Sequence, residues 1–136
     1  WRLNTYLSRI SSVEIPVANV AKAVKWYSEV LGLEIQHQDK HTAMLTFNAV
    51  GVPGIFLCQT EDTKRLDFKN THSSITHSVI DFYTDDLMGF HHYLKEQGIK
   101  VGELKIQSNS EFGGFGFGDP DGNLLSACNA IQKGQI

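Results

Sequence analysis

The sequence lacks long hydrophobic runs, a cysteine framework and an excess of basic charge, and each absence excludes a class of protein. No apolar run approaches the roughly 20 residues that a membrane-spanning helix needs. Two cysteines, Cys58 and Cys128, are too few for a disulfide-stapled secreted fold. Basic residues number 12 against 15 acidic ones, and the formal net charge of −3 gives no electrostatic reason to expect nucleic acid or an anionic membrane as a partner.

What the sequence contains is typical of a globular chain of ordinary size. Its 136 residues suit one domain, and an apolar fraction of 41% is sufficient for a core. The N-terminal segment WRLNTYLSR has no apolar stretch of the kind found in secretory signals. Because the cysteines also form no disulfide framework, we expect a protein of the reducing cytoplasm.

Two segments show the hydrophobic spacing of amphipathic helices. In NVAKAVKWYSEVLG the apolar side chains recur every three or four residues between Asn19, a suitable N-cap, and Gly32, a suitable C-terminal stop. DDLMGFHHYLKEQG repeats this pattern between Asp85 or Asp86 and Gly98. The sequence therefore predicts two helices of about three turns each.

Strand signals surround both helices in the same order. One alternating segment precedes each helix and three strand signals follow it, so the order β-α-β-β-β occurs twice. Superimposing the halves carries Glu14 onto Asp81, which indicates an internal duplication. We predict a single domain over residues 1–136, with module one at about 10–60, a linker at 61–74 and module two at about 75–131. The linker region is polar and long enough to be functional or mobile.

These features together resemble the vicinal oxygen chelate superfamily, which includes glyoxalase I, fosfomycin- and bleomycin-resistance proteins and extradiol dioxygenases. The matching stretches are EIPVANVAKAVKWYSEVLGLEI, SVIDFYTDDLMGFHHYLKEQGIKV and GFGDPDGNLL, and the resemblance covers residues 10–131. It implies an α+β fold of two tandem βαβββ modules whose mixed sheet curls around a cavity, and we expect a homodimer. The alternative is a duplicated ferredoxin-like module, which the three strand signals after each helix disfavour.

The resemblance implies four positions at which metalloenzymes of this family hold a divalent cation with His, Glu or Gln. Those positions are Ser12, Cys58, Val79 and Ser126 in this sequence, with Cys58 taken as the repeat equivalent of Ser126. Valine cannot ligate, serine hydroxyls are poor ligands, and one thiolate lacks suitable companions. We therefore predict no metal and no other cofactor at these positions.

A displaced divalent metal site built from His77, Glu14 and Asp81 is the alternative to that prediction. Without a metal, the two carboxylates are expected to bind a cationic group of a ligand, to supply a general base with a raised pKa, or to stay hydrated. The rings of Phe56, Tyr83 and Phe115 are expected either to line the pocket or to belong to the core.

The sequence thus predicts a protein that binds a small, partly apolar or aromatic molecule without the usual divalent metal, as bleomycin-resistance proteins do. One alternative is a metalloenzyme of glyoxalase or thiol-transferase type with displaced ligands, and another is a metal-free enzyme with a carboxylate base. The residues expected to contact the ligand are Ser12, Glu14, Phe56, Cys58, His77, Val79, Asp81, Tyr83, Phe115 and Ser126.

Overall fold

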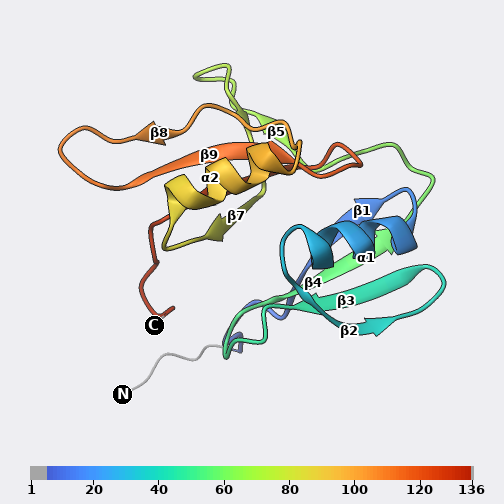
Figure 1. Cartoon of the computed structure of the whole chain (residues 1–136). Coiled ribbons are helices and arrows are strands. Elements are labelled where there is room, and N and C mark those ends of the chain that lie inside the picture. Colours follow the sequence, from blue (N-terminus) through green and yellow to red (C-terminus); the bar gives the residue numbers. More distant parts are fainter. Residues whose placement is uncertain (1–5, 136) are drawn as a thin grey trace.

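The computed structural model describes residues 6–135 and contains two modules of the same design (Figure 1). Module 1 consists of β1 (Ser12–Val17), α1 (Val20–Glu29), β2 (Glu34–Gln38), β3 (Thr42–Thr46) and β4 (Gly54–Gln59). Module 2 consists of β7 (Ile80–Tyr83), α2 (Leu87–Glu96), β8 (Lys105–Ile106), β9 (Gly113–Gly118) and β10 (Leu124–Cys128). Between them lies a short hairpin of β5 (Phe68–Lys69) and β6 (Thr76–His77). The predicted α+β fold of two βαβββ modules is confirmed.

Each module forms a four-stranded mixed sheet with the same topology. The strand orders are β1-β4-β3-β2 and β7-β10-β9-β8. In both sheets the first strand is parallel to the last, and the other neighbours are antiparallel. The two sheets stay separate and do not close around a cavity within the described chain. β1 and β7 are therefore edge strands, and no strand of residues 6–135 pairs with their outer edges.

The helix ends lie where the sequence predicts them. The Asn19 side chain accepts a hydrogen bond from the Lys22 backbone N–H at 2.9 Å, which caps the start of α1. The Asp86 side chain caps α2 in the same way. Gly32 and Gly98 follow the two helices with φ of +77°, a conformation that a glycine adopts without steric cost. No helix in the described part of the chain has the length and apolar character needed to cross a membrane.

The DPDG turn between β9 and β10 connects the two modules through buried polar groups. Asp119 is 7% exposed and accepts hydrogen bonds from the Tyr27 hydroxyl of α1 at 2.6 Å and from the Asn123 side-chain amide at 2.7 Å. The same amide donates to the Pro16 carbonyl of β1 at 2.9 Å. This turn is therefore a structural junction that fixes module 2 against both α1 and β1.

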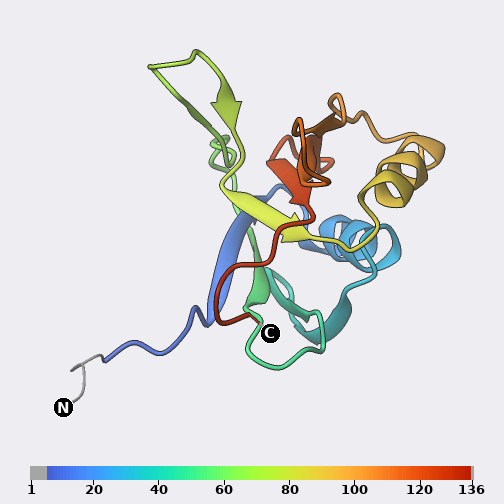
Figure 2. The ribbon, with the colours of Figure 1, turned by 90° about the vertical axis from the view of Figure 1, so that its left-hand side faces the viewer.

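The linker is fixed at its start and projects from the body further along. The Arg65 guanidinium donates to the Asp121 carbonyl at 2.9 Å, and the Leu66 backbone N–H donates to the Asn123 side chain at 2.9 Å. Beyond these contacts the chain forms the β5–β6 hairpin, which extends away from both sheets (Figure 2). The predicted linker therefore contains an anchored half and a projecting half.

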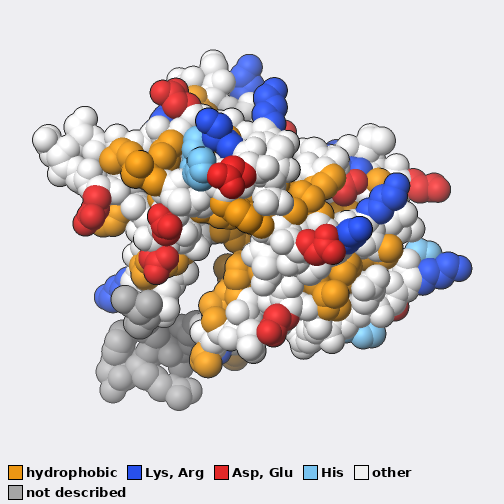
Figure 3. All heavy atoms as spheres, viewed as in Figure 1, with side chains coloured by type: hydrophobic (Ala, Val, Ile, Leu, Met, Phe, Trp, Pro, Cys, Tyr) orange, Lys and Arg blue, Asp and Glu red, His pale blue; other side chains and the backbone are white. Residues whose placement is uncertain are grey.

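The modules meet along a seam that is partly apolar at the surface. Figure 3 shows hydrophobic side chains along this boundary, while charged side chains of both signs are spread over the rest of the view. A hollow of about 540 Å³ lies where α1 approaches β9 and the segment that precedes β8. The apolar residues that line it are Trp26, Ile99, Val101, Phe117, Pro120 and Leu124.

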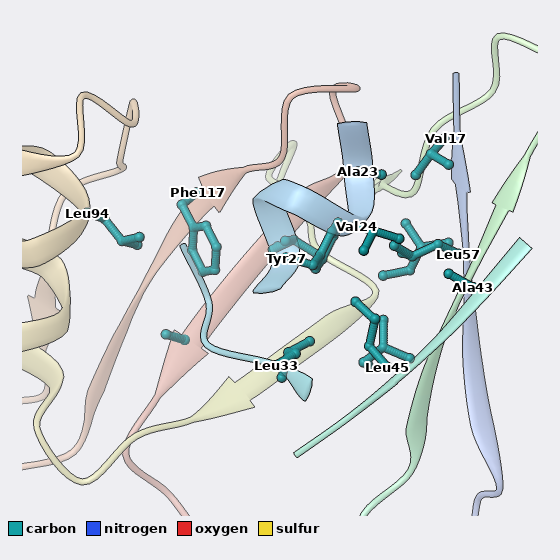
Figure 4. Packing of buried hydrophobic residues seen from close by; sticks show 14 of the residues in the cluster. Val17, Ala23, Val24, Tyr27, Leu33, Ala43, Leu45, Leu57, Leu94 and Phe117 are labelled. Carbon is teal, nitrogen blue, oxygen red and sulfur yellow. The ribbon is translucent and has the colours of Figure 1, made fainter. Parts of the chain in front are cut away.

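One hydrophobic core joins the helix-facing sides of both sheets. Figure 4 shows Tyr27 of α1 between Phe117 of module 2 and the module 1 residues Leu45 and Leu57. Phe115 also belongs to this core: it is 5% exposed and lies 5.8 Å from the ring centroid of Phe90. Of the two expectations for this ring, pocket lining or core, the structure has the second, because alternation along β9 turns Phe115 to the same side as Phe117.

Candidate functional site

The strands turn alternate side chains away from the helices, and these side chains form two faces. Face 1 belongs to module 1 and contains Ser12, Glu14, Met44, Phe56 and Cys58. Face 2 belongs to module 2 and contains Asp81, Tyr83, Gly116, Gly118, Leu124, Ser126 and Cys128, with Val79 at its border. Nearly all of the predicted site residues therefore lie on a helix-free face, divided between two sheets.

Strand register corrects one of the predicted repeat equivalences. Glu14 lies opposite Phe56, and its repeat equivalent Asp81 lies opposite Ser126. The repeat equivalent of Ser126 is therefore Phe56, and Cys58 corresponds to Cys128. The prediction was wrong because it aligned the two turns, and the β3–β4 loop at 47–53 is longer than the β9–β10 loop at 119–123.

The four positions related by the duplication offer a divalent cation no suitable donor set. They carry Ser12, Phe56, Val79 and Ser126. Zinc and similar ions take imidazole, thiolate and carboxylate ligands, and none of these groups is present at the four positions. Within residues 6–135, no group of three or more His, Cys, Asp or Glu side chains is arranged to hold a metal ion. The residues present do not fit the cation of the family's metalloenzymes.

His77 lies in the linker hairpin. Its ring stacks on Phe68 with centroids 5.2 Å apart, and its Nε2 lies 3.3 Å from the Asn70 side-chain amide. The structure does not bring His77 together with Glu14 and Asp81 as a group that could hold a metal ion. The contacts of His77 are with Asn70 and Phe68 of the same linker segment, so they stabilise the hairpin and do not indicate a ligand.

A chain of hydroxyl groups on face 2 ends at the Asp81 carboxylate. The Ser126 hydroxyl donates to Asp81 Oδ1 at 2.8 Å, which is shorter than its 3.3 Å contact with the Ile80 carbonyl. The Ser78 hydroxyl lies 2.6 Å from the Ser126 oxygen. Because Ser126 has a single hydroxyl proton and donates it to Asp81, Ser78 is the donor in the second contact. Ser126 thus orients the Asp81 carboxylate of the neighbouring strand β7.

Cys128 lies beside this chain and is poorly suited to nucleophilic chemistry. Burial raises the pKa of the Cys128 thiol, and the Asp81 carboxylate raises it further by hydrogen bonding and by repelling a thiolate. The thiolate is the reactive form of cysteine, so a raised pKa disfavours attack on a substrate at neutral pH.

The remaining face residues present exposed apolar and aromatic surface. Tyr83 is 49% exposed and Val79 is 57% exposed, although both are large apolar groups. Glu14 is exposed on the edge strand β1, and Phe56 is half-buried beside it. Sequence reasoning missed Ser78, which has no motif of its own. It also missed that the half-buried glycines of β9 lie on this face, which the alternating pattern GGFGFG indicates.

Comparison with known proteins agrees with this geometry. The family model described as the Glyoxalase/Bleomycin resistance protein/Dioxygenase superfamily matches residues 9–126. The metallothiol transferase FosB of Staphylococcus haemolyticus is 24% identical over 116 residues, which cover 85% of this chain and 79% of the relative.

Two solved structures share the fold at low sequence identity. TnmS3, an antibiotic binding protein from Streptomyces sp. CB03234, is 19% identical with a TM-score of 0.73, over 94% of this chain and 100% of that chain. Lactoylglutathione lyase from Agrobacterium tumefaciens is 18% identical with a TM-score of 0.68, over 93% of this chain and 96% of that chain. On the match of the family model over most of its length, this chain belongs to the glyoxalase/bleomycin resistance protein/dioxygenase superfamily.

Proposed function

We propose that the protein binds a small, partly apolar or aromatic molecule on its helix-free faces, without the divalent metal of its metalloenzyme relatives. The observation that carries this proposal is the side-chain set at the four symmetry-related positions, which are Ser12, Phe56, Val79 and Ser126. An apolar ring and an apolar aliphatic side chain stand where a metalloenzyme needs donors. Such groups suit contact with an organic ligand.

The surface chemistry of the faces supports capture of an organic molecule. Tyr83 and Val79 are exposed apolar groups next to the ordered polar chain of Ser126 and Asp81. Ligand sites combine apolar lining with a few oriented polar groups in this way. The structural neighbour TnmS3 is itself described as an antibiotic binding protein.

The proposal includes a homodimer in which a second copy completes the site. Faces 1 and 2 lie in separate sheets of the chain, and both edge strands β1 and β7 lack outer partners within residues 6–135. The chain exposes 9832 Å², whereas a compact monomer of this size exposes about 7,100 Å². The projecting hairpin and the exposed segment at 6–11 account for part of this excess, and we propose that a second copy buries another part of it.

A metalloenzyme of the glyoxalase or thiol-transferase type is the second candidate, and the similarity to metallothiol transferase FosB favours it. It requires ligands displaced from the family positions. A metal-free enzyme that uses Glu14 or Asp81 as a base is compatible with the exposed carboxylates. Neither candidate accounts for the apolar groups at Phe56 and Val79, so ligand binding is preferred.

Metal analysis of protein purified without a chelator separates these functions. We expect substoichiometric zinc, manganese and nickel, and no heat of binding when Zn²⁺ is titrated into the protein. The matched variant carries Ser12→His, Val79→His and Ser126→Glu, which rebuilds a family-like ligand set where face 1 of one copy meets face 2 of the other in the proposed homodimer. We expect this variant to bind Zn²⁺. A stoichiometric metal in the wild type that is lost in Glu14→Gln or Asp81→Asn would instead support the displaced metalloenzyme site.

A further inference from the structure

We infer that the hollow between α1 and the outer edge of β9 is a second small-molecule site, separate from the proposed ligand site on the helix-free faces, and that it takes an aromatic carboxylate. This inference goes beyond the proposed function, because it concerns a different part of the molecule. It is carried by two ordered walls, by an apolar lining that contains aromatic rings, and by two donors that have no acceptor within residues 6–135.

The hollow lies at the edge of β9 and does not include the polar groups of face 2. Its volume of about 540 Å³ is in the range of small-molecule sites. Gly116, Gly118 and Leu124 border it from the edge of the sheet, but Asp81 and Ser126 are not part of its lining. A molecule bound in the hollow therefore contacts neither of the two polar side chains that the proposed function uses.

The wall that precedes β8 is fixed by backbone pairing. Val101 forms a bridge with Phe117 of β9, and the Gly102 backbone N–H donates to the Gly116 carbonyl at 2.7 Å. A Cβ at Gly102 would lie 3.3 Å from the same carbonyl, so glycine permits this close approach. The Nε2 atom of His91 on α2 lies 2.9 Å from the Gly102 carbonyl and donates to it, because a carbonyl oxygen only accepts.

The opposite wall is fixed by the Asp119 carboxylate. One of its oxygens accepts hydrogen bonds from the Tyr27 hydroxyl and the Asn123 side-chain amide. The other oxygen accepts from the backbone N–H groups of Asp121 and Asn123. These bonds hold the DPDG turn against α1, the helix that carries Trp26. Both walls are therefore ordered in the chain itself, as in small-molecule sites that are formed before the ligand binds.

The lining between the walls is mainly apolar. Trp26 is half-buried and Phe117 is 2% exposed. The other apolar residues of the lining are Ile99, Val101, Pro120 and Leu124. An aromatic body suits this lining, because it covers apolar surface and packs against the indole ring of Trp26.

Lys100 determines the charge of the ligand that fits. It lines the hollow, is exposed, and forms no ion pair with any residue of 6–135. Asp119 is the other charged residue of the lining, but each of its oxygens already accepts two hydrogen bonds, which is the full capacity of a carboxylate. Asp119 therefore cannot pair with a ligand cation, whereas Lys100 can pair with a ligand anion.

The indole N–H of Trp26 is a second donor at the hollow. It makes no hydrogen bond within the described chain, and none of the buried side-chain nitrogen or oxygen atoms there lacks a partner. This N–H is therefore accessible and can donate to a ligand. A carboxylate only accepts hydrogen bonds, so it suits both the Lys100 ammonium and the Trp26 indole.

Three probes with the same body test the inference: 3-phenylpropanoate is an anion at neutral pH, 3-phenylpropanamide is neutral and 3-phenylpropylamine is a cation. Trp1→Phe leaves Trp26 as the single tryptophan, so its emission reports on the hollow when it is excited at a wavelength that the probes do not absorb. Calorimetry on the unaltered chain gives the affinities independently. We expect a saturable change in Trp26 emission with the carboxylate, which should bind about fivefold more tightly than the amide and more tightly still than the amine.

A pair of lysine variants tests the charge. Lys100→Gln should reduce the affinity for the carboxylate to that for the amide and leave the amide unaffected. Lys105→Gln is the matched control, because Lys105 is also exposed but does not line the hollow. It should leave all three affinities unchanged. An effect of Lys100→Gln no larger than that of Lys105→Gln would overturn the inference.

Other outcomes against the inference leave the proposed function in place. A carboxylate that binds no more tightly than the amide, or that leaves the emission of Trp26 unchanged, would show that the hollow is not a site for this class of molecule. Binding that calorimetry detects without a response of Trp26, and that Asp81→Asn abolishes, would place the probe on the helix-free faces instead.

Discussion

Replacing Tyr27 with phenylalanine tests whether the DPDG turn holds the two modules together. Tyr27 is fully buried, and its hydroxyl donates to the buried carboxylate of Asp119 at 2.6 Å. Tyr27→Phe keeps the ring and its packing but leaves one carboxylate oxygen with a single donor, the Asn123 side chain. A hydrogen bond to a charged group contributes about 1.5–3 kcal/mol, so we expect a loss of roughly 2 kcal/mol in the free energy of unfolding.

Urea and thermal unfolding followed by circular dichroism measure this loss. For a domain of this size, about 2 kcal/mol corresponds to a fall of roughly 5–10 °C in Tm. Tyr93→Phe is the matched control, because the Tyr93 hydroxyl donates to a neutral acceptor, the half-buried Val30 carbonyl, at 2.8 Å. That variant should lose about 1 kcal/mol. A Tyr27→Phe variant as stable as the wild type, or less affected than Tyr93→Phe, would refute the reasoning.

Burial of Tyr27 also makes the free energy of unfolding depend on pH in alkaline solution. Burial raises the pKa of Tyr27 far above its ordinary value near 10, and the Asp119 carboxylate raises it further. The unfolded chain ionises this tyrosine near pH 10 whereas the folded chain does not, so its contribution to stability is complete below pH 10 and falls as the pH rises above it. The slope is about 1.4 kcal/mol per pH unit, and Tyr27→Phe should lack it. Equal alkaline slopes in the two proteins would contradict the burial of a protonated hydroxyl.

Four further predictions concern strand β9 and the turns. Gly114→Val should destabilise the protein by more than about 2 kcal/mol, because even its Cβ would lie 2.8 Å from the backbone of Ala127. Gly116→Val should change stability by less than about 0.5 kcal/mol in the same denaturation assay. Asn123→Ala should cost more than about 3 kcal/mol, because it leaves several buried partners unpaired. Backbone N–H groups of the β2–β3 turn lower the pKa of Asp39 to about 2, so the stabilisation of that turn should be lost as the pH falls from 4 to 2. NMR of the turn amides should show this loss in the wild type and not in Asp39→Asn.

The repeated βαβββ order could be predicted from the sequence because its signals are local. Helix caps at Asn19 and Asp86 and the stops at Gly32 and Gly98 depend on neighbouring backbone groups, and the structure confirms them. The family resemblance rested on the same segments, and the family match confirms it.

The details of the site depend on contacts between distant segments, which the sequence does not determine. The equivalence of Phe56 with Ser126 follows from strand register, and a longer loop in module 1 obscured it. Ser126 hydrogen-bonds with both Ser78 and Asp81, which are more than 40 residues away from it in the sequence. No local sequence motif therefore predicts these contacts.

The separation of the faces likewise depends on tertiary packing. Helix-facing sides of both sheets share one core within the chain, so the helix-free faces are left for a ligand and for the second copy that we propose. Alternation along each strand predicts which side chains share a face, but it does not predict whether two faces of one chain meet.

The ratio of bound divalent metal to protein tests the central claim most directly. It is measured by inductively coupled plasma mass spectrometry after equilibrium dialysis of the wild type against a mixture of zinc, manganese and nickel ions and then against metal-free buffer. The account predicts that the protein retains only traces of metal, while the variant with Ser12→His, Val79→His and Ser126→Glu retains zinc. One tightly held ion per chain in the wild type would contradict it.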